Sequence, residues 1–321
     1  MYEMTKERAM ELSAHGRFGC QMVAKDIKDT PLAKDKDVCI QVVSRYGHGL
    51  AYFPNFQDDE EIVLIAVNSD SYALANASPR LQNKDNVVLA AMNGENNAEI
   101  DGKADTKEER EKLKRFARGN CLMFGGPDIK DNKDIVLKAV GLHGQALEYA
   151  SKRLKKDEEV VLTAIASTSN GYNYADISLQ EREDIAEKAF SKNSGFYLNA
   201  WWSSLPPKFQ NKKFALLYMQ NDHPSLVTNH YRHLPEPLRN DIDVTMAAIE
   251  NNIECYNHIE TEELKTSRKL AMLVITKDTS YYSKLHPMFK QDKEIVQIVA
   301  KEHHSVLSNI RTDLLYEWLG W

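Results

Sequence analysis

The sequence predicts an all-α fold, a solenoid of tandem short helix pairs with a period of about 25 residues. The first observation behind this prediction is internal similarity, because residues 58–81 and 131–154 align without a gap and share 12 of 24 positions. The second is that one apolar quartet returns along the whole chain, and the third is that each copy has helical spacing. Such repeats bury their apolar faces only against their neighbours.

Each repeat begins with an acidic turn that is followed by the apolar quartet. The first apolar residues of the quartets are Val38, Ile62, Val87, Ile135, Val160, Ile185, Phe214, Val244, Leu270 and Ile295. They lie 24, 25, 48, 25, 25, 29, 30, 26 and 25 residues apart. We interpret the step of 48 as two repeats, the second one degenerate, because residues 117–131 resemble residues 15–30 and both contain Asp-Ile-Lys-Asp. The chain is therefore expected to hold roughly a dozen repeats.

Two short helices are expected in each repeat, as the copy at 131–154 illustrates. The first helix has apolar residues at i, i+1, i+4 and i+5, namely Ile135, Val136, Ala139 and Val140. The second has them at i, i+1, i+4 and i+8, namely Ala146, Leu147, Ala150 and Leu154. His143 and Gly144 lie between the two faces, where a tight turn is needed. Asp131, or Asp157 in the next repeat, is expected to cap a first helix.

One continuous array over residues 1–321 is expected, and its regularity changes along the chain. The stretches are degenerate repeats at 1–57, regular repeats at 58–190 with an irregular loop near 93–104, lengthened repeats rich in proline and aromatic residues at 190–240, and C-terminal repeats with an aromatic cap at 241–321. The alternative to a cap is an exposed tail that binds a partner. Insertions in repeat proteins map to loops on one face, which is often the binding face; the alternative is drift under weak constraint.

Composition favours a folded protein of a reducing compartment. The net charge is −6 with a pI near 6.0, whereas general binders of nucleic acid or anionic membranes usually carry a basic excess. The cysteines Cys20, Cys39, Cys121 and Cys255 form no C-x-x-C pair, so free buried thiols are expected. We expect no Sec-type signal peptide and no membrane span, because the N-terminus lacks an apolar core and no apolar run is long enough. The predicted location is cytoplasmic, in a bacterium or in a host cell.

The repeat consensus reads D-x-[DE]-[IV]-V-L-x-A-[VI], then G-x-A-L-x-x-A-S-x-x-L. It resembles a family of tandem α-helical repeats that is known as a domain of unknown function. Residues 58–81, 131–154 and 157–165 carry the resemblance, which becomes patchy after about residue 190. The resemblance implies a scaffold without catalytic residues, of a kind seen in bacterial effectors, phage proteins and protist proteins. It also implies that a function specific to this chain would lie at the departures at 93–116 and 190–240.

No motif of the sequence predicts a reaction, a metal or a cofactor. No G-K-[ST] follows Gly125-Gly126, and neither a G-x-S-x-G elbow nor an H-E-x-x-H motif occurs. His223, His230 and His233 lie within eleven residues, but zinc needs three or four converging ligands. We interpret these histidines as surface or half-buried residues, and we expect no metal and no cofactor.

Aromatic residues give the most specific functional hint. We predict a partner-binding surface between residues 172 and 231, with Tyr172, Tyr174, Tyr197, Trp201, Trp202 and Tyr231. Large aromatic side chains near a surface are typical interface anchors. The alternative is that one of the adjacent tryptophans packs in the core and the other covers a groove between repeats.

Two clusters of basic residues occur in this chain although its net charge is negative. The residues proposed for an anionic ligand are Lys112, Lys114, Arg115 and Arg118 in the first cluster and Lys152, Arg153, Lys155 and Lys156 in the second. A superhelix could bring the clusters together, but glutamates dilute the first, so a salt-bridged solvent face is the favoured interpretation.

The sequence therefore predicts a non-enzymatic interaction protein that binds a partner macromolecule, most of all a protein. The setting that the resemblance implies is host manipulation, by a bacterial effector or a phage counter-defence factor. Two alternatives stay open. One is a binder of nucleic acid or another anionic ligand, and the other is an enzyme with a cryptic groove site that uses His230 or His233.

Overall fold

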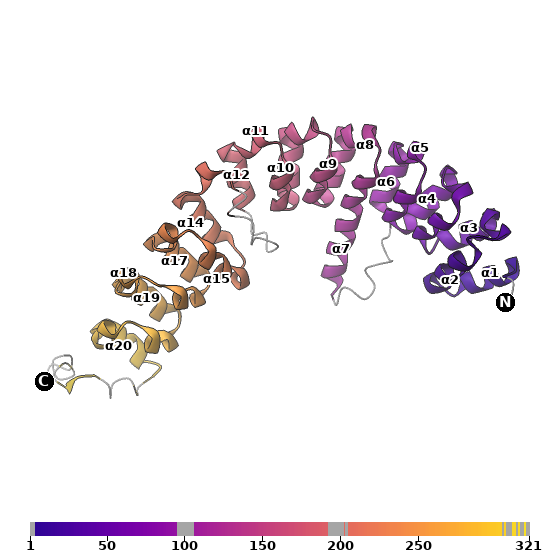
Figure 1. Ribbon diagram of the computed structural model, residues 1–321. Coiled ribbons are helices and arrows are strands. Elements are labelled where there is room, and N and C mark those ends of the chain that lie inside the picture. The colour runs from indigo at the N-terminus through magenta and orange to yellow at the C-terminus, as the bar shows by residue number, and fades with distance from the viewer. Residues whose placement is uncertain are drawn as a thin grey trace. The chain divides into compact units, whose positions relative to one another are not determined.

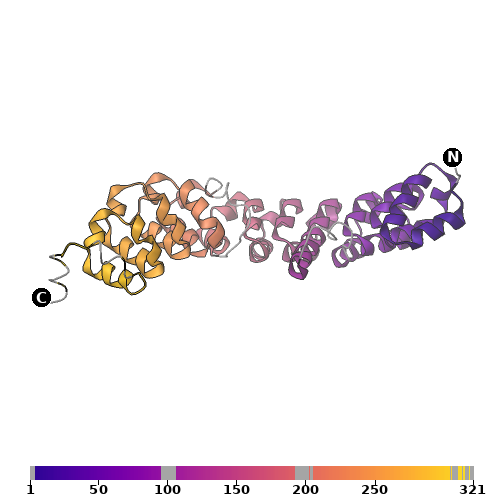
Figure 2. The same ribbon diagram turned by 90° about the horizontal axis from the view of Figure 1, so that it is seen from below.

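Helices are the only regular secondary structure in the part of the chain that the computed structural model describes, which confirms the predicted all-α class. The described residues are 4–94, 106–191 and 205–303, with single positions at 202, 305, 310–312, 314 and 318. They form two compact units, residues 1–189 (unit 1) and 190–321 (unit 2). Within each unit the helices follow one another in chain order (Figures 1 and 2). Each unit is described by itself, and one continuous array stays a prediction.

Every repeat begins with an α-helix of eight to ten residues, as the apolar spacing predicts. These first helices are α1 (Lys6–Ala14), α3 (Lys36–Val43), α4 (Glu60–Ser69), α6 (Asp85–Asn93), α9 (Lys133–Leu142), α10 (Glu158–Ser167), α12 (Glu183–Phe190), α14 (Lys212–Asn221), α17 (Ile242–Asn251), α19 (Arg268–Lys277) and α20 (Lys293–Ala300). Side chains of Asp, Asn, Ser or Thr cap most of them by accepting backbone N–H bonds. The predicted cap Asp157 is confirmed, since it accepts from the N–H groups of Glu159 and Val160.

The second half of a repeat differs from the prediction, because most repeats have a short 3-10 helix there. These are η2 (Gly47–Tyr52), η4 (Ser71–Asn76), η6 (Gly144–Tyr149), η8 (Ser169–Tyr174), η10 (Ile253–His258) and η11 (Thr279–Lys284). A second short turn follows, in η1 (Pro31–Lys34), η3 (Pro54–Phe56), α5 (Pro79–Gln82), α8 (Pro127–Asp131), η7 (Leu154–Lys156), α11 (Ile177–Gln180), η9 (Pro207–Phe209), α16 (Glu236–Arg239), α18 (Glu262–Lys265) or η12 (Pro287–Gln291). Three second halves contain longer helices, which are α2 (Arg17–Ile27), α7 (Lys107–Asn120) and α15 (Pro224–His233).

The predicted helix through Ala146, Leu147, Ala150 and Leu154 is therefore wrong, although all four side chains are buried. Ala150 has an extended backbone with φ −66° and ψ 156°, which ends η6. The reason lies in the next residue, because the N–H of Ser151 donates to the carbonyl of Lys130 in the preceding repeat. A backbone donor that bonds across repeats cannot continue a local helix.

Close backbone approach explains the turn between the two halves. A Cβ atom on Gly144 would lie 2.2 Å from the carbonyl oxygen of Ala164 in the following first helix. Gly47 has the same relation to Ala66, where the distance would be 2.3 Å. Only glycine lets η2 and η6 pack this closely on the next repeat.

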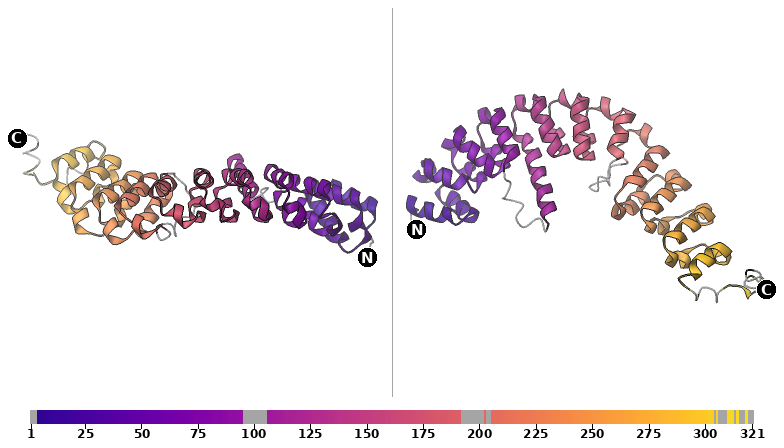
Figure 3. Two further views of the ribbon diagram at one scale, coloured as in Figure 1. Left: turned by 90° about the horizontal axis from the view of Figure 1, so that it is seen from above. Right: turned by 180° about the vertical axis from the view of Figure 1, so that it is seen from behind.

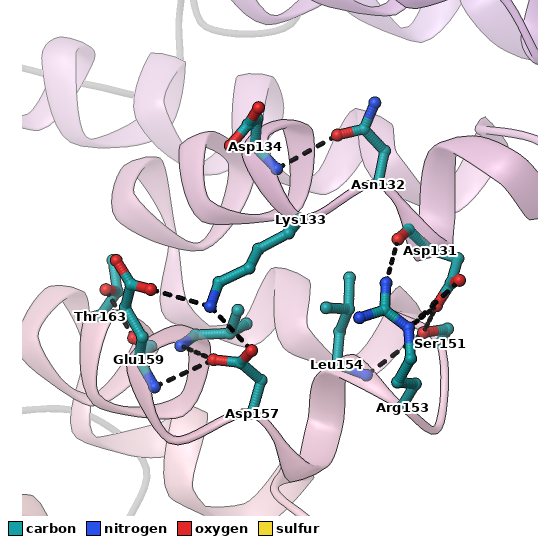
Figure 4. A network of polar contacts seen from close by, with 11 residues as sticks. Asp131, Asn132, Lys133, Asp134, Ser151, Arg153, Leu154, Asp157, Glu159 and Thr163 are labelled. Carbon is teal, nitrogen blue, oxygen red and sulfur yellow. Dashed lines mark hydrogen bonds and ion pairs between the residues drawn. The ribbon is translucent and has the colours of Figure 1, made fainter.

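Polar contacts join successive repeats at the N-terminal ends of the first helices (Figure 4). The Nζ atom of Lys133 lies 2.8 Å from both Asp157 and Glu159 of the next repeat. Lys36 contacts Asp59 and Glu61 in the same way. These ion pairs explain why acids recur at one position of the repeat.

Asp131 is not the cap of α9, which corrects the prediction. Asn132 caps that helix, while Asp131 ends α8 and accepts hydrogen bonds from Ser151 Oγ and Arg153 Nε. Figure 4 shows both side chains turned toward Asp131. In the earlier copy of the repeat, Asp58 accepts from Ser78 and Arg80. The shared Ala-Ser and Arg-Leu letters of the two copies thus belong to a polar contact between the second half of one repeat and the end of the repeat before it.

The step of 48 residues is one enlarged repeat and not two repeats, so that prediction was wrong. Regular repeats are joined by a backbone bond from Ser78 N to Gln57 O or from Ser151 N to Lys130 O, which spans 21 residues. The equivalent bond runs from Gly126 N to Gln82 O and spans 44. The insertion includes α7, which extends beyond the neighbouring helices α6 and α9 (Figures 1 and 3). The resemblance of 117–131 to 15–30 therefore relates two second halves.

The lengthened repeats at 190–240 have a simple explanation where they are described. The second half after α14 is the ten-residue helix α15, in place of a six-residue 3-10 turn. Pro224 occupies its first turn, where the missing N–H needs no partner. Much of the predicted loop near 93–104 lies outside the described residues, as do most residues after 303, where the predicted aromatic cap ends the chain. None of the helices in the described part is long and apolar enough to cross a membrane.

Candidate functional site

The aromatic residues predicted as partner anchors separate into core and half-buried positions. Tyr172 and Tyr231 are 2% and 1% exposed, so their side chains cannot contact a partner in this conformation. Tyr174 and Trp202 are half-buried. Tyr197 and Trp201 lie outside the described residues, as does any surface that they would form.

The two buried tyrosines close the second halves of their repeats. The hydroxyl of Tyr172 donates to the carbonyl of Gln180 at 2.6 Å, and that of Tyr231 donates to the carbonyl of Arg239 at 2.8 Å. Tyr282 makes the same bond, again eight residues ahead, to Lys290. Burial raises the pKa of Tyr231 to about 12, which keeps its hydroxyl protonated and able to donate. These contacts support the fold.

The structure does not bring the two basic clusters together. Arg115 of α7 donates to the carbonyl of Gly141 near the C-terminal end of α9. Arg153 contacts Asp131, which lies just before the N-terminal end of α9. A helix of ten residues, about 15 Å long, separates these two places.

Most of the second cluster is engaged inside unit 1. Arg153 is held by Asp131, Lys155 donates to the carbonyl of Glu148 at 2.7 Å, and Lys156 lies 3.8 Å from Asp176. In the first cluster Arg118 donates to the carbonyl of Gly94 at 2.8 Å. Arg153, Lys155 and Lys156 therefore make ion pairs or hydrogen bonds to carbonyl groups within unit 1, as expected for a salt-bridged solvent face.

The three clustered histidines have different partners. His230 is buried, which corrects its interpretation as a surface or half-buried residue, and its Nδ1 lies 2.6 Å from Asp222 Oδ2 and 2.5 Å from the hydroxyl of Tyr218. His223 Nδ1 contacts Ser225 Oγ, and His233 Nδ1 contacts the carbonyl of Asn229. Burial raises the pKa of Tyr218 strongly, with a smaller contribution from the Asp222 carboxylate. Within the described ranges no three His, Cys, Asp or Glu residues converge as metal ligands.

A row of aromatic side chains crosses the second halves of successive repeats in unit 1. We call Tyr46, His48, Tyr72 and Phe124 the aromatic row. The ring centroids of Tyr46 and His48 are 6.4 Å apart, those of His48 and Tyr72 also 6.4 Å, and those of Tyr72 and Phe124 5.8 Å. All four side chains are half-buried. Side chains from η2 and the residue before it, from η4 and from η5 (Cys121–Phe124) thus form one continuous surface feature.

A buried carboxylate fixes the N-terminal end of the aromatic row. Asp70, whose side chain is 4% exposed, accepts a hydrogen bond from His48 Nδ1 at 2.9 Å and lies 4.0 Å from Arg17. The guanidinium of Arg17 lies over the Tyr46 ring, 5.2 Å from its centroid. Burial raises the pKa of Tyr46, with smaller effects of Tyr52, Arg17 and Asp70. These contacts hold the rings in place before any ligand binds, which lowers the entropy cost of binding.

Large apolar side chains are exposed in several second halves of unit 1, and Met123 among them lies next to the aromatic row. Six large apolar side chains are exposed in the described residues, and five of them belong to second halves in unit 1: Phe18, Met22, Phe116, Met123 and Ile177. Phe18 and Met22 are one turn apart on α2 and are 74% and 43% exposed. Met123 is adjacent to Phe124 in η5. Exposed apolar groups that cluster in this way mark interaction sites more often than single ones do.

Sequence reasoning missed the aromatic row, although a signal was present. His48 and Tyr72 occupy the second position of η2 and η4, so aligning the second halves of the repeats would place them side by side. The arrangement offers stacking and apolar contact along several repeats, flanked by the cationic Arg17. Such a row of rings is suited to binding.

Comparison with known proteins agrees with the repeat architecture. A model of the family described as "Domain of unknown function (DUF4116)" matches residues 35–82, 113–155, 132–180 and 211–265. Three of these matches begin at the cap of a first helix, namely Asp35, Asn132 and Asn211. Searches of curated proteins and of solved structures found no match. Because the matched segments cover more than half of the chain, the protein belongs to the family of tandem repeats described as the domain of unknown function DUF4116.

Proposed function

We propose that the protein is a non-enzymatic interaction protein, and that it binds a segment of a partner protein along the aromatic row of unit 1. The observation that carries this proposal is the continuity of Tyr46, His48, Tyr72 and Phe124 across repeats, next to exposed Met123. Aromatic and methionine side chains are enriched in the centres of protein interfaces. The partner segment is extended and carries aromatic or aliphatic side chains, because the surface is a row and not a deep pocket.

The chemistry of the surface favours a protein over nucleic acid. The chain has a net charge of −6, and of the cationic groups beside the row Arg17 lies over the Tyr46 ring and Lys130 donates to the carbonyl of Met123. Nucleic-acid binding needs several phosphate contacts from lysine or arginine. The family resemblance supports a host protein as the partner, in the setting of a bacterial effector or a phage factor. The free, buried cysteines support a reducing compartment such as the cytoplasm.

Panning a displayed library of random peptides against the whole protein tests this proposal. Selected peptides should carry aromatic or aliphatic residues and should bind the wild type. Tyr72→Ala and Met123→Glu should each weaken binding by about tenfold, which corresponds to about 1.4 kcal/mol at an interface hot spot. Ile177→Ser is the matched control, because Ile177 is 60% exposed and lies on α11 of the same unit, away from the row.

The result that would overturn the proposal is binding that survives both row substitutions while Ile177→Ser weakens it. A library that yields no peptide for the wild type would do the same. Far-UV circular dichroism of each variant separates a lost contact from a lost fold. Met123→Glu guards the test against misfolding, because Met123 is 40% exposed and contributes little to the core.

A further inference from the structure

The inserted helix α7 differs from every first helix in how it is supported. Its residues from Lys107 to Lys112 are all exposed, whereas Ala117, Gly119 and Asn120 at its other end are buried. Figure 3 shows this N-terminal part standing clear of the neighbouring ribbons of unit 1. A helix that buries only its last turns gains little stability from packing along its first turns.

Local devices hold the projecting part of α7 in helical form. Thr106 Oγ1 accepts from the N–H of Glu109, and the Glu109 carboxylate accepts from the N–H of Thr106, both at 3.1 Å. This reciprocal capping box satisfies backbone donors that packing does not cover. At the base, Arg115 and Arg118 bond the carbonyls of Gly141 and Gly94, so α7 is fixed to the ends of α9 and α6. The helix is therefore anchored and preorganised, without being buried.

Charge on α7 opposes the charge of the chain. Residues 107–118 include six lysines and arginines and three glutamates, in a protein with a net charge of −6. Two of the six, Arg115 and Arg118, serve the anchor. Lys107 and Arg110 are exposed near the positive end of the helix dipole, which adds to their field.

Apolar side chains lie among these charges. Phe116 is 40% exposed, with its ring 4.7 Å from that of His143, and Leu113 is half-buried one turn away. Arg110 lies three residues before Leu113 and four before Lys114, so its side chain neighbours both on the surface of α7. We propose that α7 is a second docking element, which binds an acidic protein segment that also carries apolar side chains.

Lys107, Arg110 and Lys114 are spaced i, i+3 and i+7 and so share one side of α7, which favours an acidic ligand. Leu113 beside Arg110 favours a protein segment over a nucleic acid. The phosphate groups of a nucleic acid would pair with Lys107, Arg110 and Lys114 but would make no favourable contact with the apolar side chain of Leu113. An acidic helix or strand uses both kinds of contact. This site uses residues other than the aromatic row, so either site can fail a test without the other.

Fluorescence anisotropy with a labelled peptide that repeats Glu-Glu-Leu-Phe tests the proposal on the full chain. The triple change Lys107→Glu, Arg110→Glu and Lys114→Glu should weaken binding by tenfold or more, and binding to the wild type should weaken as salt rises. The matched control is Lys25→Glu, Lys152→Glu and Lys301→Glu, which makes the same change in net charge on exposed lysines elsewhere and should leave the affinity unchanged.

Three outcomes would overturn the proposal. The first is equal weakening by the two triple variants, which would mean a general charge effect. The second is binding of a Glu-Glu-Ser-Ser peptide or of single-stranded oligouridine as strong as that of the Glu-Glu-Leu-Phe peptide, because the apolar pair would then have no role. The third is self-association of the wild type that the α7 variant abolishes, which would make a second copy the occupant. Tyr72→Ala should not change binding of this peptide.

Discussion

Replacing Tyr172 by phenylalanine distinguishes a core residue from an interface anchor. The substitution keeps the ring, which is 2% exposed, and removes only the hydroxyl that donates to the carbonyl of Gln180 at 2.6 Å. A buried hydrogen bond contributes about 0.5–1.5 kcal/mol, and an acceptor that loses its donor costs about 1–3 kcal/mol. We therefore expect Tyr172→Phe to lower the free energy of unfolding by about 1–2 kcal/mol.

Urea unfolding followed by circular dichroism measures this effect. The midpoint should fall while the slope of the transition stays constant, because the surface exposed on unfolding does not change. Tyr174→Phe is the matched control, two residues further in the same η8 and half-buried, and it should change the free energy by less than about 0.5 kcal/mol. A wild-type midpoint for Tyr172→Phe, with loss of partner binding, would refute the assignment of Tyr172 to the core.

Two further predictions concern thiols and pH. Burial raises the pKa of Cys39 and Cys121 to about 12, so both should resist a thiol reagent at pH 8 in the native protein and react once it is denatured; rapid reaction in the native state would contradict this. Lys133 lowers the pKa of Asp157 below its ordinary 3.8, so their pair stabilises the fold above about pH 4 and is lost as pH falls through the folded-state pKa. The difference in unfolding midpoint between wild type and Lys133→Met should therefore be present at pH 7 and shrink toward pH 3, and a constant difference would count against the pair.

The first helices could be predicted from sequence, whereas the second halves could not. Ile135, Val136, Ala139 and Val140 lie on one buried helical face, as their spacing indicates. The spacing in the second half is equally compatible with a helix, but Ser151 uses its N–H for a bond to another repeat. Periodicity along the chain does not report hydrogen bonds between repeats, so it could not decide this case.

Two residues of the predicted aromatic site, Tyr172 and Tyr231, are buried, and sequence could not show this for a related reason. Tyr172 occupies the place in η8 that Leu74 and Leu147 occupy in η4 and η6, where the side chain faces the core. Tyr172 was predicted as a surface residue because it belongs to the aromatic residues between 172 and 231, although it replaces a core leucine of other repeats. The aromatic row was missed because its members are 24 or more residues apart, except for Tyr46 and His48.

The hydrogen bond from the Gly126 N–H to the Gln82 carbonyl closes the segment that contains α7, so α7 is an insertion within its repeat. This bond closes a segment of 44 residues where regular repeats close 21, so the segment roughly doubles in length. The entropy of closing a flexible loop rises by only about 0.6 kcal/mol for each doubling. Stacking on either side is set by residues before and after the insertion, such as Asn132 and Asp85, whose side chains bond across it. A repeat frame of this kind can gain, lose or exchange a whole binding element at one junction, while the rest of the array keeps its register.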